Sequence, residues 1–508
     1  MKHLLLLIGI LLLTASNVGH AQNLTFKINN LPDTTVHLAR YYGAKLLFAD
    51  TTELKKGVAV FDGKKHKPGM YAFVLPGQQY FEFIHNDEEV LIETVVPDFF
   101  ENIKVKKSAE NQLFYTYVNF MKQNQADAKA LNEERANTED ETRKEQLSQQ
   151  LKDLWEQSQT YQKRMVAENE GTLVAKIMRM NIDVKVPDAP KNEDGSLKDS
   201  NFNYNFFRDH FFDNVDLTDP RLVRTPVFQH KFDYFYSKEM LIQHPDTIFK
   251  YLSRVIDQMP QGTEMYQFAV TTAATSLNKS KIMGMDRAFN LLVDRYFCGK
   301  DKEGKPKSFW LTDEKRDELC ENTAKRLRLV QGEVPPNLIL PDSTNAKWYN
   351  LHEIDAEYVV IYFWDPNCGH CKKEVPKMGK LYDEKFKDRN IEVYSVGKAT
   401  GEDFEAWKEF IKKHNLSFIN VGLTQAIYKQ AKQDPKSLIP GTTTLESLNY
   451  QDTYEIYSTP RLFILDKDKK IIGKGLGIAQ LEEYMDKIQG FEDAEKLFKV
   501  EEEKKDSE

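Results

Sequence analysis

The chain has 508 residues, enough for about three domains of roughly 100–200 residues each. Its net charge of −8 is small for this length, so no global basic signal points to nucleic acid or anionic lipid as a partner. The apolar fraction of 41% and the charged fraction of 29% are those of a soluble globular protein.

Residues 1–21 predict a secretory signal peptide. Lys2 supplies positive charge, residues 4–13 are an unbroken apolar run, and residues 19–21 (Gly-His-Ala) offer small side chains for cleavage. About ten apolar residues are too few to span a bilayer, which needs about 20. We expect cleavage before Gln22, a periplasmic or secreted protein and no transmembrane segment; an uncleaved anchor is the alternative.

Residues 22–107 predict a small β-sandwich-like domain, because short alternating or aromatic runs are separated by turn residues. The expected strands cover residues 24–28, 36–41, 58–61, 71–75, 80–84, 90–95 and 103–106.

Residues 108–330 predict a helical domain. The polar stretch 126–150 indicates an exposed helical hairpin with i,i+4 charge pairs, with partner docking as the alternative. Residues 184–203 carry Pro, Gly, Asn and Asp and predict a loop. Further helices are expected around residues 204–212, 227–242, 247–259, 264–277, 286–297 and 312–330. An aromatic stripe within them is interpreted as core rather than as a binding site: Phe228, Phe232, Phe235 and Tyr236.

Four cysteines in an exported chain of this length are too few for a disulfide scaffold. Cys298 and Cys320 lie in the helical region, and the sequence cannot give the distance between them. A structural disulfide and two buried free thiols are both compatible with the sequence.

Residues 331–490 alternate between strand and helix patterns after a Gly-Glu-Val-Pro-Pro boundary at 332–336. The expected strands are 358–364, 391–396, 418–421, 462–465 and 471–474, and the expected helices are 372–387, 403–414 and 479–488. The charged tail, residues 491–508, is expected to fray or to be disordered.

Cys368 and Cys371 form a CxxC pair between the buried strand 358–364 and a helical pattern. Cys368 therefore falls at or just before a helix N-terminus, where unpaired N–H groups and the helix dipole stabilise a thiolate. We expect Cys368 to attack a disulfide and Cys371 to resolve the mixed disulfide, so that the pair forms a redox disulfide. A zinc site is the competing interpretation, but a structural zinc site uses four ligands and the chain has no second CxxC, so we expect no metal. We also expect no cofactor.

Two neighbours complete the expected catalytic group. A partly cationic His370 beside the thiolate would favour the reduced form of the pair; an exposed turn residue is the alternative. Glu374 lies three residues after Cys371 and could accept its proton, or could be a solvated helix residue.

Residues 332–490 resemble the thioredoxin fold, and specifically the TlpA-like periplasmic thiol:disulfide oxidoreductases. The resemblance lies in residues 332–336, in Phe363-Trp364, in Cys-Gly-His-Cys at 368–371, in Lys-Lys-Glu-Val-Pro at 372–376 and in Thr459-Pro460. It implies that Thr459 and Pro460 form a cis-proline loop that binds extended substrate backbone, with Trp364 and Asn367 at the substrate-facing rim. Cys-Gly-His-Cys is also the motif of protein disulfide isomerase domains, which implies a pair more oxidising than that of thioredoxin.

The sequence departs from the thioredoxin pattern at three places. Asn367 replaces the usual Trp before the first cysteine, and Tyr362 replaces the buried acid six residues before it, which leaves Glu374 as the better candidate for proton relay. Residues 425–450 resemble an insertion that covers or extends the substrate groove.

The sequence thus predicts an exported thiol:disulfide oxidoreductase. Its partners would be extracytoplasmic protein thiols and disulfides and a membrane or periplasmic electron donor, with no nucleic acid. Reduction is the usual direction in the resembling family, and isomerisation stays open. A thiol peroxidase is disfavoured because Ile361 and Asp365 stand where its motif has Pro and Thr or Ser. A redox-regulated binding or scaffold protein, with the main role in residues 22–330, is the non-enzymatic alternative.

Overall fold

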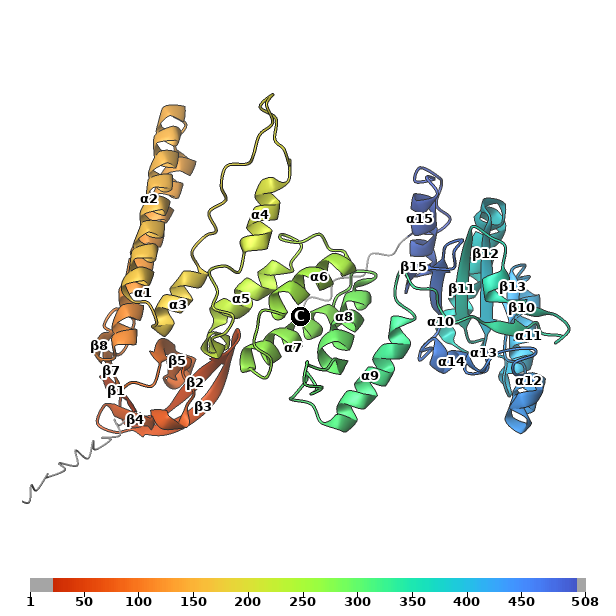
Figure 1. Cartoon of the computed structure of the whole chain (residues 1–508), viewed down its shortest axis with the longest axis horizontal. Helices are drawn as coiled ribbons and strands as arrows, with labels where there is room; N and C mark the ends of the chain where they lie inside the picture. Colours follow the sequence, from red (N-terminus) through yellow and green to blue (C-terminus); the bar gives the residue numbers. More distant parts are fainter. Residues whose placement is uncertain (1–21, 500–508) are drawn as a thin grey trace, which may run out of the picture. The chain divides into compact units, whose positions relative to one another are not determined.

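The computed structural model describes residues 22–499, so the predicted signal peptide and residues 500–508 of the predicted tail lie outside the described residues. The described chain divides into two compact units, residues 22–241 with 255–269 and residues 242–254 with 270–499 (Figure 1). Helices α6 (Pro245–Ile256) and α7 (Glu264–Asn278) run through two of the three points of division. The finer division at residues 107 and 330 stays a prediction.

The first unit begins with two four-stranded sheets, ordered β4-β1-β7-β8 and β3-β2-β5-β6. Alternate residues of both sheets enter one apolar core, in which the rings of Phe26 and Phe73 lie 4.4 Å apart. The predicted strands are present, and β3 is an additional strand that the sequence analysis missed. The bounds are β1 Asn23–Asn29, β2 Thr34–Tyr42, β3 Lys45–Leu54, β4 Val58–Asp62, β5 Gly69–Val74, β6 Tyr80–His85, β7 Val90–Val95 and β8 Lys104–Lys107.

Helices form the rest of the first unit. The predicted hairpin is confirmed as α1 (Ala109–Asn137) and α2 (Glu141–Glu168), and the Asp140 carboxylate begins α2 by accepting the backbone N–H groups of Thr142 and Arg143. Three shorter helices follow, α3 (Leu173–Met180), α4 (Phe202–His210) and α5 (Pro226–Phe235). The phenylalanines of the predicted aromatic stripe are buried, as expected for core residues.

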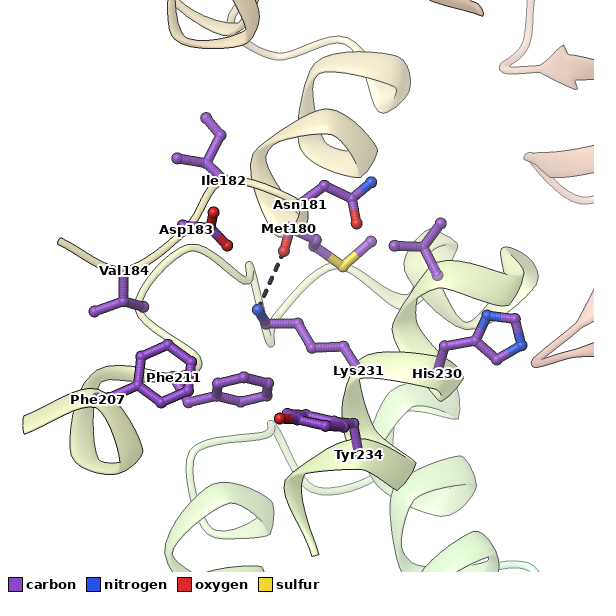
Figure 2. Close-up of a pocket in the computed structure, with 11 residues that line it drawn as sticks. Met180, Asn181, Ile182, Asp183, Val184, Phe207, Phe211, His230, Lys231 and Tyr234 are labelled. Atoms are coloured by element: carbon purple, nitrogen blue, oxygen red, sulfur yellow. Dashed lines mark hydrogen bonds between the residues drawn. The ribbon is translucent and has the colours of Figure 1, made fainter. Parts of the chain in front are cut away.

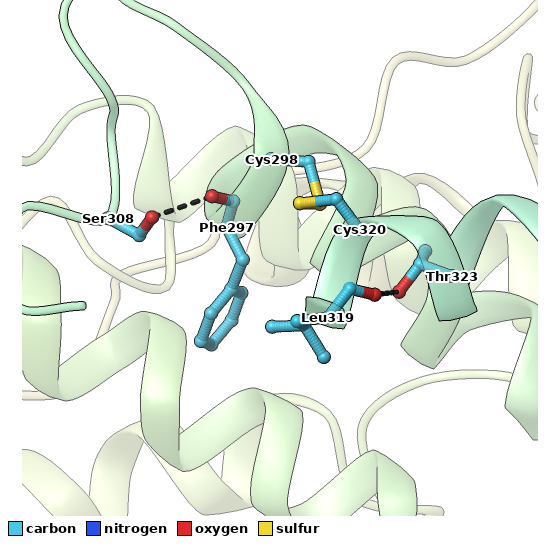
Figure 3. The surroundings of a disulfide bond; sticks show 6 residues. All are labelled: Phe297, Cys298, Ser308, Leu319, Cys320 and Thr323. Atoms are coloured by element: carbon cyan, nitrogen blue, oxygen red, sulfur yellow. Dashed lines mark hydrogen bonds between the residues drawn. A yellow bond between two sulfur atoms is a disulfide. The ribbon is translucent and has the colours of Figure 1, made fainter. Parts of the chain in front are cut away.

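A disulfide joins two helical segments of the second unit. Cys298 ends a π-helical turn, Asp294–Cys298, that continues α8 (Met285–Val293), and Cys320 lies in α9 (Asp313–Leu327). The two residues are bonded, with Phe297 and Leu319 beside them (Figure 3). The structure thus selects the disulfide from the two alternatives that the sequence left open.

A five-stranded sheet, ordered β13-β12-β11-β14-β15, forms the centre of the C-terminal part. Strand β11 is central; it runs parallel to β12 and antiparallel to β14. The bounds are β11 Tyr358–Trp364, β12 Ile391–Gly397, β13 Ile419–Val421, β14 Arg461–Leu465 and β15 Ile471–Lys474.

Both faces of this sheet are covered. Helices α10 (Gly369–Leu381), α11 (Asp403–His414) and α15 (Ile478–Ile488) contribute to the core on the face that contains the even-numbered residues of β11. The expected insertion contains α12 (Gln425–Gln433), and its buried side chains Ile427, Leu438 and Tyr450 join the core on the opposite face. These side chains are therefore part of the core rather than a wall of a substrate groove.

Candidate active site

Cys368 is the N-cap residue of α10 and follows directly on the turn that ends β11. The Asp365 carboxylate accepts the backbone N–H of Asn367, at 2.7 Å, and the Asp365 carbonyl accepts the N–H of Cys368, at 3.1 Å. Asp365 thus fixes the turn that presents the cysteine, as short acidic side chains commonly do. The first thiol stands at the positive end of the helix dipole.

The two thiols are free and differ in exposure and acidity. Cys371 is fully buried, and burial raises the pKa of its thiol to about 11. Cys368 is half-buried. Burial also opposes its ionisation, but hydrogen bonds from the backbone N–H and the thiol of Cys371 and from the side chain of Thr459 outweigh it and lower the pKa of Cys368. At neutral pH Cys368 is therefore the more readily ionised of the two.

The Thr459–Pro460 peptide bond is cis and lies beside the first cysteine. The Cys368 thiol donates to the Thr459 carbonyl, with Sγ and O 3.3 Å apart. Tyr457, two residues earlier, is 75% exposed. Tyr457 was not predicted from the sequence, although its place just before the cis-proline loop makes it a candidate for substrate contact.

A cavity of about 230 Å³ beside α10 brings together Tyr362, His370, Glu374 and Pro460. Glu374 is largely buried and pairs with Lys377 at 2.8 Å. His370 is exposed. The Tyr362 hydroxyl, in contrast, is buried and has no hydrogen-bond partner among the described residues. Both cysteines and Glu374 act on that hydroxyl through their charges, so it lies within electrostatic range of the dithiol.

The expected role of Trp364 at the rim is corrected by its burial. The side chain is only 1% exposed, its indole N–H donates to the Ser395 hydroxyl at 2.7 Å, and its ring packs on Phe410. The last residue of β11 therefore belongs to the core. Asn367 is exposed beside Cys368, and its amide donates to the Asp403 carboxylate at 2.5 Å.

Within 22–499, no three or more His, Cys, Asp or Glu side chains are arranged so that they could hold a metal ion. In the same part of the chain, no helix is both long and apolar enough to cross a membrane.

Two family models match separate parts of the chain. Residues 332–474 match the AhpC/TSA family, and residues 23–114 match a domain of unknown function, DUF4369. Thiol-disulfide oxidoreductase ResA of Bacillus cereus is 28% identical over 168 residues, which are 32% of this chain and 82% of that protein. ResA of Bacillus subtilis is 33% identical over 90 residues, 18% of this chain and 48% of that protein.

Two solved structures are also similar. The thioredoxin domain of a Bacteroides vulgatus thiol-disulfide oxidoreductase is 24% identical, with a TM-score of 0.25, and the match covers 31% of this chain and 97% of that one. A thioredoxin-like protein from Bacteroides caccae is 15% identical, with a TM-score of 0.30, over 59% of this chain and 98% of that one. On the family match and the ResA relatives, residues 332–474 are a thioredoxin-like domain of the AhpC/TSA family, homologous to the thiol-disulfide oxidoreductases.

Proposed function

We propose that this protein is an exported thiol:disulfide oxidoreductase that reduces, and could isomerise, disulfides of extracytoplasmic proteins. The relatives support the redox class of the enzyme. One observation carries the assignment of roles: Cys368 is half-buried at a helix N-terminus with a lowered pKa, whereas Cys371 is buried with a raised one. Export rests on the sequence of residues 1–21.

In the proposed reaction, the Cys368 thiolate attacks one sulfur of a substrate disulfide. A Cys368–substrate disulfide forms, the substrate S–S bond breaks, and one substrate thiolate leaves. Cys371 then loses its proton and attacks Cys368, which releases the second substrate thiolate and leaves a Cys368–Cys371 disulfide. The substrate gains two electrons, its two thiolates take up protons, and a membrane or periplasmic electron donor must reduce the pair again.

Glu374 would accept the proton that Cys371 loses. Its carboxylate is largely buried one helical turn beyond Cys371 and shares the cavity with Tyr362 and His370. The unpaired Tyr362 hydroxyl would donate to the Cys371 thiolate or to the Glu374 carboxylate, since a buried hydroxyl without a partner costs about 1–3 kcal/mol.

Substrate would lie against the cis-proline loop. The Thr459 carbonyl next to Cys368 can accept a backbone N–H of an extended peptide once the thiol has reacted. Asn367 and the exposed Tyr457 would supply side-chain contacts beside it.

Trapping tests the assignment of the two cysteines. The Cys371→Ser variant should accumulate mixed disulfides through Cys368 with extracytoplasmic proteins, and the intact chain should reduce insulin with a thiol reductant. The variant in which both positions are Ser is the matched control and should trap none. Absence of trapped partners together with absence of insulin reduction would refute the proposal.

A further inference from the structure

Helix α5 has two faces of different character in the first unit. Phe228, Phe232 and Phe235 point into the core and are buried. Val227, Lys231 and Tyr234 recur at positions i, i+4 and i+7 and line a cavity instead (Figure 2). The helix thus presents a lysine to a hollow rather than to open solvent.

The cavity has a volume of about 320 Å³ and is largely apolar. Aromatic rings of Phe207, Phe211 and Tyr234 form one wall, and the segment after α3, including Val184, forms another (Figure 2). Pockets for small ligands begin at about 300 Å³ and usually combine apolar walls with a few placed polar groups.

Lys231 is the cation of this cavity, and it lacks an anionic partner. Its ammonium lies 4.1 Å from the centre of the Phe211 ring and donates to the Met180 carbonyl at 3.1 Å, where α3 ends. An ammonium has three donors, so further hydrogen bonds are open to it. Within residues 22–499 no carboxylate lies at ion-pair distance from Lys231. Burial lowers the pKa of Lys231 to about 8, and the charge of Asp183 opposes this shift.

We propose that this cavity binds a small carboxylate with an apolar body, through an ion pair between the ligand and Lys231. The carboxylate supplies the missing counter-charge and occupies the remaining donors, and the apolar body packs on the rings of Phe207 and Phe211. A fatty acid and the C-terminal residue of an apolar peptide share this chemistry. The site lies in the first unit and does not depend on the cysteine chemistry of the second.

The negative charge of Asp183 predicts the direction in which a substitution there changes the affinity for a ligand. Its side chain is exposed, lines the cavity and repels a bound carboxylate at long range. Removing its charge should strengthen the binding of a carboxylate and should weaken the binding of any cation. Raising the pH should weaken binding as Lys231 loses its proton. His230 and Tyr234, which also line the cavity, are the other titratable groups.

Calorimetric titration of the full chain with octanoate and with N-acetylphenylalanine tests the site and distinguishes the two sources. At least one carboxylate should bind, its uncharged amide should bind at least about tenfold more weakly, and K231M should lose at least about tenfold in affinity. At pH 6, where Lys231 is protonated with or without the Asp183 charge, D183N should bind more tightly than wild type. K238M, at an exposed lysine beyond α5, should bind as wild type does.

A labelling experiment measures occupancy of the cavity in the wild-type protein. The bound carboxylate, and not its amide, should protect Lys231 from acetylation, measured by peptide mass spectrometry with Lys238 as the internal standard. No saturable binding of either carboxylate up to about 10 mM, unprotected Lys231, or weaker binding by D183N would overturn the proposal and leave Lys231 as a cap of the α3 carbonyl.

Discussion

The acidities of the two active-site thiols predict a large difference in their reactivity towards iodoacetamide. At pH 7, a thiol with a pKa of about 11 is ionised in about one molecule in ten thousand, which applies to Cys371. Cys368, whose pKa lies below its ordinary value of 9.0, is ionised in more than about one in a hundred. Ionisation therefore favours Cys368 by more than about 100-fold.

Intrinsic nucleophilicity acts in the opposite direction. A more basic thiolate attacks faster, and over this difference in pKa the gain for Cys371 is roughly tenfold. The net preference for Cys368 is therefore at least about tenfold before access is considered. Because Cys371 is fully buried and Cys368 is half-buried, access enlarges this preference.

Timed alkylation with peptide mass spectrometry measures both rates in one sample. The Cys371 rate should keep rising with pH up to about 11, whereas the Cys368 rate should level off earlier. In denaturant the two cysteines should react at similar rates, which controls for the reagent. Equal rates in the native protein, or faster labelling of Cys371, would contradict the proposed division of roles.

Three further predictions concern groups around and beyond the dithiol. Glu374→Gln should slow release of a substrate trapped on Cys368, measured by stopped-flow, whereas Glu384→Gln, at an exposed pair about three turns further along, should not. Replacing the Cys298–Cys320 disulfide by two serines should lower the free energy of unfolding of the unit by about 3 kcal/mol in urea titrations, because a 22-residue loop is released; an unchanged midpoint would contradict this. Lys385→Met should cost roughly 3–5 kcal/mol in the same assay, because it removes the lysine from the Glu482 carboxylate, which is 1% exposed, whereas Asp486 keeps Arg389 and Lys496; a loss below about 1 kcal/mol would count against a buried ion pair.

The C-terminal elements could be predicted closely because their sequence patterns agree with their environments. Strand β11 is buried on both faces, so a continuous apolar run identified its bounds. Strand β3 was missed because it lies at a sheet edge and leaves most of its side chains at least partly exposed, including Phe48, so the alternation of apolar residues is lost. The helix expected over residues 227–242 ends at Phe235.

The sequence identified the dithiol and the cis-proline loop through spacing and resemblance, but tertiary packing decided the remaining features. The apolar run that ends in Trp364 does not show which of its residues reaches the rim, and the indole turned out to be core. In the sequence, Lys231 is one of 70 Lys and Arg residues and has no distinguishing pattern around it. Its environment depends on tertiary contacts such as the hydrogen bond to the Met180 carbonyl, about 50 residues earlier. Pairing of Cys298 with Cys320 required a distance that no sequence pattern contains.

The unequal acidities also influence the poise of the proposed redox pair. Lowering the pKa of Cys368 stabilises the reduced form, because that form gains the free energy of the thiolate whereas the disulfide cannot ionise. The raised pKa of Cys371 has no opposing effect at neutral pH, since that thiol is protonated in any case. The pair should therefore be more oxidising than two ordinary thiols at a pH where Cys368 is ionised to a substantial extent. The groups that lower the pKa of Cys368 include backbone N–H groups at the start of α10 and Thr459, so the helix start and the cis-proline loop would contribute to this poise. The role of the His370 imidazole stays a prediction.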